Sequence, residues 1–353
     1  KEAANNVLDS GRLIKGPVVR EFEEEFAKSS DTNEAVAVSN GTAALLLAMK
    51  TLNIGPGDEV LVPAHTYFAT VSPVLEQGGS PVFIDIDPAR RTMDPDHLRK
   101  EAQRVDNPAA IVVTHMHGQP AEMDEIVDIA EAYDLPIIED AAQAHSAEYK
   151  NQKVGSIGDI GCFSFYPTKN MTVGGDGGMI VTDNKEISEK ARQLRNHGRD
   201  KKGNHITLGL NYRLSEINAA IGLEQLKNLQ DWTEKRKSAA EKYNEKLKDF
   251  DPVKVPEIFE DSEPVFHHYA IQTQVGERNC LKNYLEMNNI GTGIHYENAV
   301  HNQPAVSDRT SSVKLPEAEK YCSQTLSLPM HPQLNDAEIN YVTEQIKAYE
   351  VFQ

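Results

Sequence analysis

Short apolar runs alternate with longer helical stretches through the first half of the chain, and this alternation limits the possible folds more than any other feature. Most of the runs are separated by helical stretches such as Ala43–Leu52, Asp94–Val105 and Met123–Tyr133. Strand and helix in alternation predict an α/β fold, a mostly parallel sheet flanked by helices. The expected strands are Ala35–Val38, Val60–Val62, Val82–Ile86, Ala110–Thr114, Ile137–Glu139, Cys162–Phe165 and Met179–Thr182.

The remaining segments predict a second, smaller α+β domain. Composition changes beyond about Asn228, and we expect a large domain over residues 1–230 and a small one over 231–353. The N-terminal stretch 3–26 should be helical on both sides of Gly16-Pro17 and pack on the small domain. The expected C-terminal elements are a charged helix over 231–248, strands near 268–274 and 293–295, and a helix over 278–289.

Composition excludes several classes of protein. Thirty-six basic against 54 acidic side chains give a formal net charge of -18, which argues against nucleic acid or anionic membrane as a partner. The cysteines Cys162, Cys280 and Cys322 form no CxxC pair, so we expect a reducing compartment and no zinc module. No apolar run approaches the ~20 residues of a membrane span, and no signal peptide opens the sequence. We expect a cytoplasmic protein.

Lys169 follows an expected buried strand and precedes a loop that is almost free of side chains. Tyr166-Pro167-Thr168 ends the strand, and glycines at 174, 175, 177 and 178 force a tight turn before the next strand. Rigid backbone therefore presents one amine beside space for a planar cofactor, and lysine is the residue that forms Schiff bases. The alternative is a solvated turn lysine.

The segment Ser39-Asn40-Gly41-Thr42 ends the first strand and begins a strong helix. Free amides of Gly41 and Thr42 at the positive end of the helix dipole would hold a phosphate. The alternative is an ordinary N-cap by Ser39 or Asn40.

Aromatic and histidine residues follow the second and fourth strands. Tyr67 could lie flat on a heteroaromatic ring, and the alternative is an ordinary core aromatic, as we expect for Phe68. His115 and His117 form an HxH pair, but no matching cysteine or carboxylate cluster accompanies them. We therefore expect no metal site.

The fifth strand ends in two carboxylates, Glu139 and Asp140. Alternation along a strand points them to opposite faces, so one of them can enter a site. A buried carboxylate needs a cationic partner, and a pyridinium N–H is one such partner for Asp140. The alternative is an aspartate that caps a helix.

In this order the residues resemble those of the fold type I pyridoxal phosphate enzymes, and most closely those of the sugar aminotransferase (DegT) family. The resemblance runs from about Gly11 to the C-terminus. It rests on ordered segments that include GPVVREFEEEFA, SNGTAAL, GPGDEVLVPAHTYFAT, HMHGQPAEM, IIEDAAQAHSAEY, FSFYPTKN with GGDGG, GLNYRLSEINAAIGLEQL and GIHYENAVH.

The resemblance implies a site for pyridoxal 5'-phosphate in which Lys169 forms the Schiff base and moves a proton between substrate and cofactor. It implies further that Asp140 pairs with the pyridine nitrogen, Tyr67 stacks on the ring, Gln143 lies near the phenolic oxygen, and Gly41, Thr42 and Ser164 take the phosphate. In this family an asparagine at the position of Asn211 reaches the phosphate in the neighbouring subunit. A homodimer with shared active sites is therefore expected.

The implied reaction transfers an amino group from an amino acid, by resemblance glutamate, to a keto-sugar linked to a nucleotide. Some family members carry histidine at the lysine position and act as dehydratases, so Lys169 favours transamination. Ser146 and Glu297 depart from the family pattern near the substrate surface, so the identity of the sugar stays open. The position of the keto group, C3 or C4, stays open as well.

Other functions also stay open. The acceptor could be a cyclic ketone without a nucleotide, or the chain could be a regulatory or sensory protein that keeps the cofactor without turnover. A Rossmann-type nucleotide-binding enzyme is supported only by the GGDGG cluster, which lies between a lysine and a strand rather than between strand and helix. His295, Tyr296 and His301 would face the substrate if the small domain closes on the site.

Overall fold

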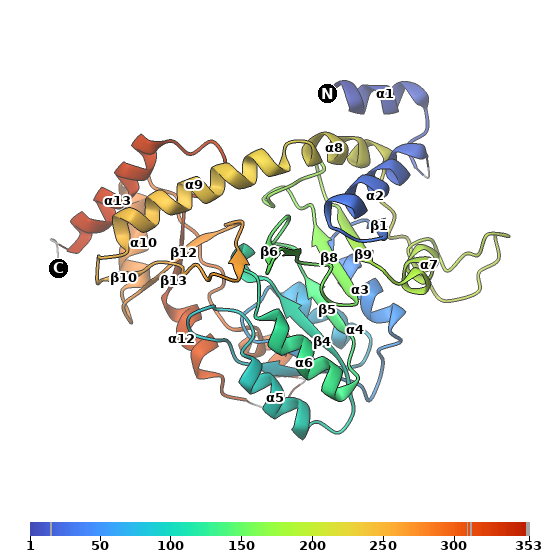
Figure 1. Ribbon diagram of the computed structural model, residues 1–353, viewed down its shortest axis with the longest axis horizontal. Coiled ribbons are helices and arrows are strands. Elements are labelled where there is room, and N and C mark those ends of the chain that lie inside the picture. The colour runs from blue at the N-terminus through green and yellow to red at the C-terminus, as the bar shows by residue number, and fades with distance from the viewer. Residues whose placement is uncertain (15, 309, 311–312, 351–353) are drawn as a thin grey trace.

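The structure, a computed structural model, describes residues 1–14, 16–308, 310 and 313–350. Within them, seven strands form the large sheet in the order β1-β9-β8-β5-β4-β2-β3 (Figure 1). β9 is antiparallel to both of its neighbours, and the other pairs are parallel. The strands are β1 Glu34–Val38, β2 Glu59–Pro63, β3 Ser80–Ile84, β4 Pro108–Thr114, β5 Ile137–Asp140, β8 Ile160–Ser164 and β9 Gly178–Thr182. All the expected strands of this sheet are confirmed.

Alternate residues of these strands enter two hydrophobic clusters, one on each face of the sheet. Leu61 and Val113 belong to one cluster, whereas Val60 and Val112 belong to the other. The first face is covered by α2 (Pro17–Ser29), α5 (Pro95–Arg104), α6 (Met123–Tyr133) and α8 (Glu216–Leu226), and the second by α3 (Gly41–Thr51), α7 (Lys185–Leu194) and α12 (Pro316–Gln324). Because both faces are buried, the strands are apolar on both sides, as parallel strands usually are.

The N-terminal helices pack chiefly on α8 and β1, which corrects the expected packing on the small domain. Helices α1 (Glu2–Ser10) and α2 lie on either side of Gly16-Pro17 as predicted. The carboxylate of Glu216, at the start of α8, accepts hydrogen bonds from the backbone N–H groups of Gly16 and Val18 at 2.7 and 2.9 Å. A distant side chain thus caps α2, and the sequence around the helix gives no sign of it.

The C-terminal part has its own core around an antiparallel sheet in the order β10-β12-β13. Its strands are β10 Val253–Lys254, β12 Tyr269–Thr273 and β13 Thr325–Leu328. The long helix α9 (Leu229–Leu247) runs from the large sheet to this core and packs there beside α13 (Asp336–Glu350) (Figure 1). Gly293 makes only an isolated bridge to Ser327, so the strand expected at 293–295 is wrong. Residues of α12 belong to the large-sheet cluster, and a domain boundary near residue 230 stays a prediction.

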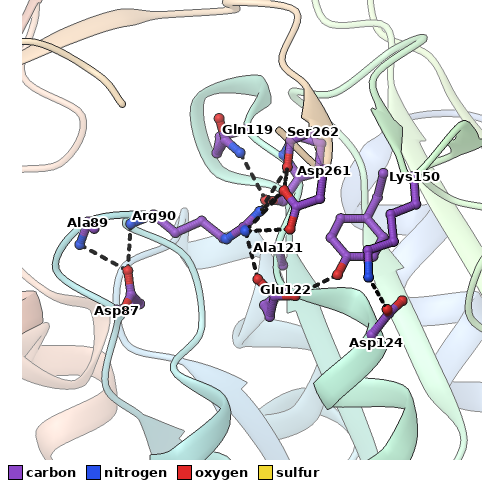
Figure 2. Close-up of polar contacts among 12 residues, drawn as sticks. Asp87, Ala89, Arg90, Gln119, Ala121, Glu122, Asp124, Lys150, Asp261 and Ser262 are labelled. Atoms are coloured by element: carbon purple, nitrogen blue, oxygen red, sulfur yellow. Dashed lines mark hydrogen bonds and ion pairs between the residues drawn. The ribbon is translucent and has the colours of Figure 1, made fainter. Parts of the chain in front are cut away.

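A buried arginine joins the two parts of the chain. Arg90 forms ion pairs with Glu122 at 2.6 Å and with Asp261 at 2.8 Å, and Figure 2 shows its guanidinium group between these two carboxylates. Next to it, strand β11 (Ser262–Glu263) pairs with β6 (Glu148–Tyr149). This side of the junction is therefore fixed by charge-assisted hydrogen bonds as well as by backbone pairing.

The other elements are short or peripheral. They are η1 Phe68–Thr70, α4 Ser72–Glu76, η2 Met116–Gly118, β7 Gln152–Lys153, α10 Arg278–Met287, η3 Val300–Asn302 and α11 Pro304–Ser307.

Candidate functional site

The residues that the sequence singled out gather at the carboxyl edge of the large sheet. Asp140 and Ser164 are the last residues of β5 and β8, and Lys169 lies in the turn after β8. Tyr67 follows β2, and Gly41 begins α3 just after β1. Ligands of parallel α/β sheets bind beyond this edge, because loops there extend from rigid strands.

The Lys169 amine is held in a mostly enclosed position. The backbone N–H of Lys169 donates to the carbonyl of Tyr166 at 2.8 Å, which closes the turn. Burial lowers the pKa of the Lys169 amine to about 8, and the negative charge of Asp140 acts against this shift. A lysine with a lowered pKa is more often neutral and hence nucleophilic near neutral pH.

The Asp140 carboxylate lies on the same side of the sheet edge and is 5% exposed. Its oxygens accept hydrogen bonds from the Thr70 hydroxyl at 2.7 Å and from the backbone N–H of Ala142 at 3.2 Å. Burial raises the pKa of Asp140, whereas these donors and Lys169 oppose the shift. Glu139 points to the opposite face and bonds to His115, as strand alternation predicted.

The start of helix α3 at Gly41 lies very close to Ser164 at the end of β8. Asn40 caps α3 by accepting from the N–H of Ala43 at 2.8 Å, while the N–H groups of the first turn have no partner within a helix. A Cβ added to Gly41 would lie 2.7 Å from the Cβ of Ser164. The N-cap and the phosphate cradle are therefore compatible, since Asn40 uses only one of the free amides.

Gln143 connects the sheet edge to the small domain. Its Oε1 accepts from the backbone N–H of His117 at 2.8 Å, and its Nε2 donates to the Tyr296 hydroxyl at 3.2 Å. The Tyr296 ring lies 5.5 Å from the ring of Tyr67, whose own side chain is 57% exposed. Tyr296 thus reaches the site as the sequence suggested. Phe68, expected in the core, is instead 36% exposed, because it begins a short surface turn.

Two other predicted neighbours are held away from the site. His301 is buried and bonds to Glu319 through its Nε2 at 3.1 Å, which is a structural role. Glu297 pairs with Arg278 at 3.1 Å, so this departure from the family pattern is engaged in an ion pair at the surface.

The sequence suggested His295 near the site but missed the other neutral histidines near Lys169. Burial lowers the pKa of His145 to about 3, and the charge of Lys169 contributes to this shift. His268 stacks on His295 with ring centroids 3.7 Å apart, and the charge of Lys169 helps to lower the pKa of both. These residues come from three separate segments, so no local spacing could have revealed the group.

Asn211 is exposed, and it lies beside exposed apolar side chains. Backbone bridges tie the segment to Asn196 and Val38. The large apolar side chains of Ile206, Leu208 and Leu210, which precede Asn211, are 58, 81 and 53% exposed.

These groups have the chemistry that pyridoxal phosphate requires. Asp140 is a buried acceptor, the Lys169 amine has no hydrogen-bond acceptor among the described residues, and the Gly41–Ser164 approach leaves no room for a side chain where a phosphate would lie. In the part of the chain that the structure describes, no group of three or more histidine, cysteine, aspartate or glutamate side chains could hold a metal ion. Nor is any described helix both long and apolar enough to cross a membrane.

Comparisons with known proteins agree with this geometry. The dTDP-3-amino-3,4,6-trideoxy-alpha-D-glucose transaminase of Streptomyces venezuelae is 38% identical over 348 residues, which cover 98% of this chain and 91% of that protein. The pleiotropic regulatory protein of Geobacillus stearothermophilus is also 38% identical over 348 residues, with 98% and 92% covered. The crystal structure of S. venezuelae DesV in complex with a ketimine intermediate superposes with a TM-score of 0.95 at 38% identity, and covers 99% of this chain and 93% of that chain.

The model of the DegT/DnrJ/EryC1/StrS aminotransferase family matches residues 1–347. The chain therefore belongs to this family of pyridoxal-phosphate-dependent sugar transaminases.

Proposed function

We propose that the chain transfers an amino group from glutamate to the keto carbon of a nucleotide-linked sugar. Glutamate becomes 2-oxoglutarate, and the amino group replaces the keto oxygen of the sugar. The observation that carries the proposal is that a buried carboxylate, Asp140, and a lysine whose amine has a pKa of about 8 lie at the same edge of the sheet and influence each other's charge. Pyridoxal phosphate, when bound, supplies a ring that accepts the electron pair left by proton removal.

The residues of this chain then have distinct roles. Lys169 holds the cofactor and moves the proton at the reacting carbon, for which a pKa near the working pH is favourable. Asp140 keeps the ring nitrogen protonated, and Tyr67 lies against the ring. Gln143 contacts the phenolic oxygen region while Tyr296 orients its amide. Gly41, Thr42 and Ser164 hold the phosphate at the start of α3.

We also propose that the active form is a homodimer in which Asn211 contacts the phosphate in the partner's site. The exposure of Asn211 beside the apolar Leu208 and Leu210 supports this proposal, because such side chains are usually covered by a partner. Sedimentation should show a dimer, and Asn211→Ala should weaken cofactor binding without unfolding the chain. A fully active monomer would contradict the shared site.

For the acceptor, we propose a sugar with its keto group at C3. The name of the S. venezuelae relative, a 3-amino sugar transaminase, supports this position. The purified chain should be tested with matched dTDP-linked 3-keto and 4-keto sugars, and then with the same sugars on UDP. Faster turnover of a 4-keto sugar would overturn the choice of carbon and leave the transaminase assignment intact.

The central experiment is an absorbance spectrum with added pyridoxal phosphate, before and after glutamate. We expect a visible band that glutamate converts to a near-ultraviolet band and that a keto-sugar restores. Lys169→Ala is the control, because it should show no band of this kind. A band that responds to no amino acid would contradict the proposal.

A second candidate function is a regulatory protein that keeps the cofactor without turnover. The relative named as a pleiotropic regulatory protein supports this function. Its sequence identity to the chain, 38%, is the same as that of the transaminase relative, which supports catalysis. The free Lys169 amine opposite Asp140 argues for turnover, since a purely structural cofactor needs no proton-transfer group. The response to glutamate separates the two.

A further inference from the structure

Three buried threonine hydroxyls form a row that ends on Asp140. Thr66 and Thr70 follow β2, Thr114 is the last residue of β4, and Asp140 is the last residue of β5. In the sheet order β5-β4-β2, the row starts on β4, passes to the loop after β2 and returns to β5, where Asp140 is the register partner of Thr114. The side chains of Thr66, Thr70 and Thr114 are only 3, 0 and 4% exposed, so bulk water does not compete for these bonds.

The distances define one continuous chain of hydrogen bonds. Thr70 Oγ1 lies 2.7 Å from Asp140 Oδ2, and Thr66 Oγ1 lies 2.6 Å from Thr70 Oγ1. Thr114 Oγ1 lies 3.1 Å from Thr66 Oγ1. Each hydroxyl carries a single hydrogen but can accept two bonds.

Counting hydrogens fixes the direction of the chain. An ionised carboxylate has no proton, so Thr70 must donate to Asp140. Thr70 then has no hydrogen left for Thr66, which must donate to Thr70. By the same count Thr114 donates to Thr66. All three hydroxyls therefore donate in the same direction along the row, which ends at Asp140, and hydrogen bonds in such a row strengthen one another.

The opposite direction needs a protonated Asp140, which would donate to Thr70 and reverse the row. The other titratable groups that act on Asp140 or are acted on by it are Lys169, His115, Cys162 and Tyr296. Among them Lys169 and His115 favour the carboxylate. The threonine row adds to these groups a fixed set of dipoles that favours the carboxylate too.

We propose that Thr70 and Thr66 are positioning residues that keep Asp140 ionised and aimed at its ligand. The proposal rests on the proposed role of Asp140 as partner of the pyridine nitrogen. Thr70 acts directly on the carboxylate, and Thr66 acts through Thr70. Neither residue touches the reacting atoms, so removing their hydroxyls should change the pH range of cofactor binding rather than the chemistry.

The test compares Thr70→Val, which keeps the shape and removes the hydroxyl, with Thr70→Ser, which keeps the hydroxyl. Pyridoxal phosphate affinity is measured from the visible band across pH. We define the acidic limb as the pH range in which affinity for pyridoxal phosphate falls as Asp140 becomes protonated. Thr70→Val should move this limb to higher pH by about one unit, because the carboxylate loses a hydrogen bond that stabilises its charged form. Thr66→Val should move it by less, and Thr70→Ser should leave it in place. An unmoved limb in Thr70→Val overturns the proposal.

A matched control is Thr182→Val on β9. Thr182 is also buried, and its hydroxyl donates to the carbonyl of Asp159 at 2.7 Å, far from Asp140 in the sheet. Thr182→Val should lower the unfolding free energy without moving the acidic limb. A shift as large as that of Thr70→Val would mean that general destabilisation causes the effect, and would contradict the proposal.

A measurement without cofactor separates this proposal from the proposed function. In the cofactor-free chain, the difference in unfolding free energy between wild type and Asp140→Asn, followed across pH, reports the titration of Asp140. The same difference in the Thr70→Val and Thr66→Val backgrounds should have a midpoint at higher pH. A wild-type chain that binds no pyridoxal phosphate contradicts the proposed function, whereas an unmoved midpoint contradicts the threonine row.

Discussion

Glu139 and Asp140 are adjacent carboxylates at the end of the same strand, but the regions around them differ. Glu139 is fully buried and accepts from the N–H groups of Gly155, Ile157 and Gly158 and from His115. Asp140 has two donors within the chain, Thr70 and Ala142, and a raised pKa. Glu139 organises a loop and is satisfied within the chain, whereas Asp140 has fewer partners and is the carboxylate that we propose to meet a ligand.

The two carboxylates suggest a division of roles between the two faces of β5. Buried polar groups in folded proteins usually find all their partners, and a group with perturbed titration in a site is a functional candidate. The face of β5 that carries Glu139 should therefore govern stability. The face that carries Asp140 should govern cofactor binding and turnover, at some cost in stability.

The largest effect is expected when Asp140 is substituted, and it should be on turnover. Asp140→Asn should lower kcat by about 10²–10³-fold, because a charge that stabilises the transition state is lost. The unfolding free energy of the cofactor-free chain should not fall, since a buried charge with few partners has been removed. Steady-state kinetics and urea unfolding check the two statements. Near-normal turnover would remove Asp140 from the proposed site.

The second largest effect is expected when Glu139 is substituted, and it should be on stability. Glu139→Gln should lower the unfolding free energy by about 1.5–3 kcal/mol, because a buried carboxylate that accepts from His115 and from the 155–158 turn is replaced by an amide that cannot accept all of these hydrogen bonds. Glu224→Gln, which removes an exposed partner of Lys227, is the control and should change little. If urea unfolding gives equal losses for both variants, the structural role assigned to Glu139 is wrong.

A pH dependence separates Lys169 from ordinary surface lysines. The pKa of its amine is lowered from 10.5 to about 8 in the folded chain, so the unfolded chain holds more protons between these values. Stability should therefore rise with pH from about 8 to 10.5. Lys169→Met should be more stable than wild type below pH 8, and the gap should shrink across this window.

Unfolding in urea at several pH values measures this gap. Lys201→Met, at an exposed turn position, is the control and should leave the unfolding curve unchanged at each pH. A gap between Lys169→Met and wild type that stays constant with pH would be inconsistent with a buried, titrating amine.

The smallest effect is expected at the phosphate cradle. Gly41→Ala would bring a Cβ to 2.7 Å from the Cβ of Ser164, so the helix start must shift. We expect weaker binding of pyridoxal phosphate with only a modest loss of stability. Gly55→Ala is the control, because its Cβ would meet nothing closer than 3.9 Å. Equal cofactor affinity in both variants would argue against the cradle at Gly41.

Much of the fold follows from local pattern. The expected strands of the large sheet coincide with observed ones within two residues at each end, because apolar runs bounded by turn residues have few other stable arrangements. The prediction failed at 293–295, where a single bridge replaces the expected strand. It failed also for Phe68 and for the contacts of the N-terminal helices, because burial at those positions depends on distant elements.

The family, the succession of strands along the chain and the candidate residues can be read from the amino-acid sequence, since strand ends and helix starts are local features. The folded chain is needed to see which carboxylate is satisfied, which histidines lie near Lys169, and that hydrogen bonds connect Thr66, Thr70 and Thr114 to Asp140. Hydrogen bonds and burial depend on distances in space, which local sequence does not give. Here β2, β4 and β5 are neighbours in the sheet but are separated along the chain.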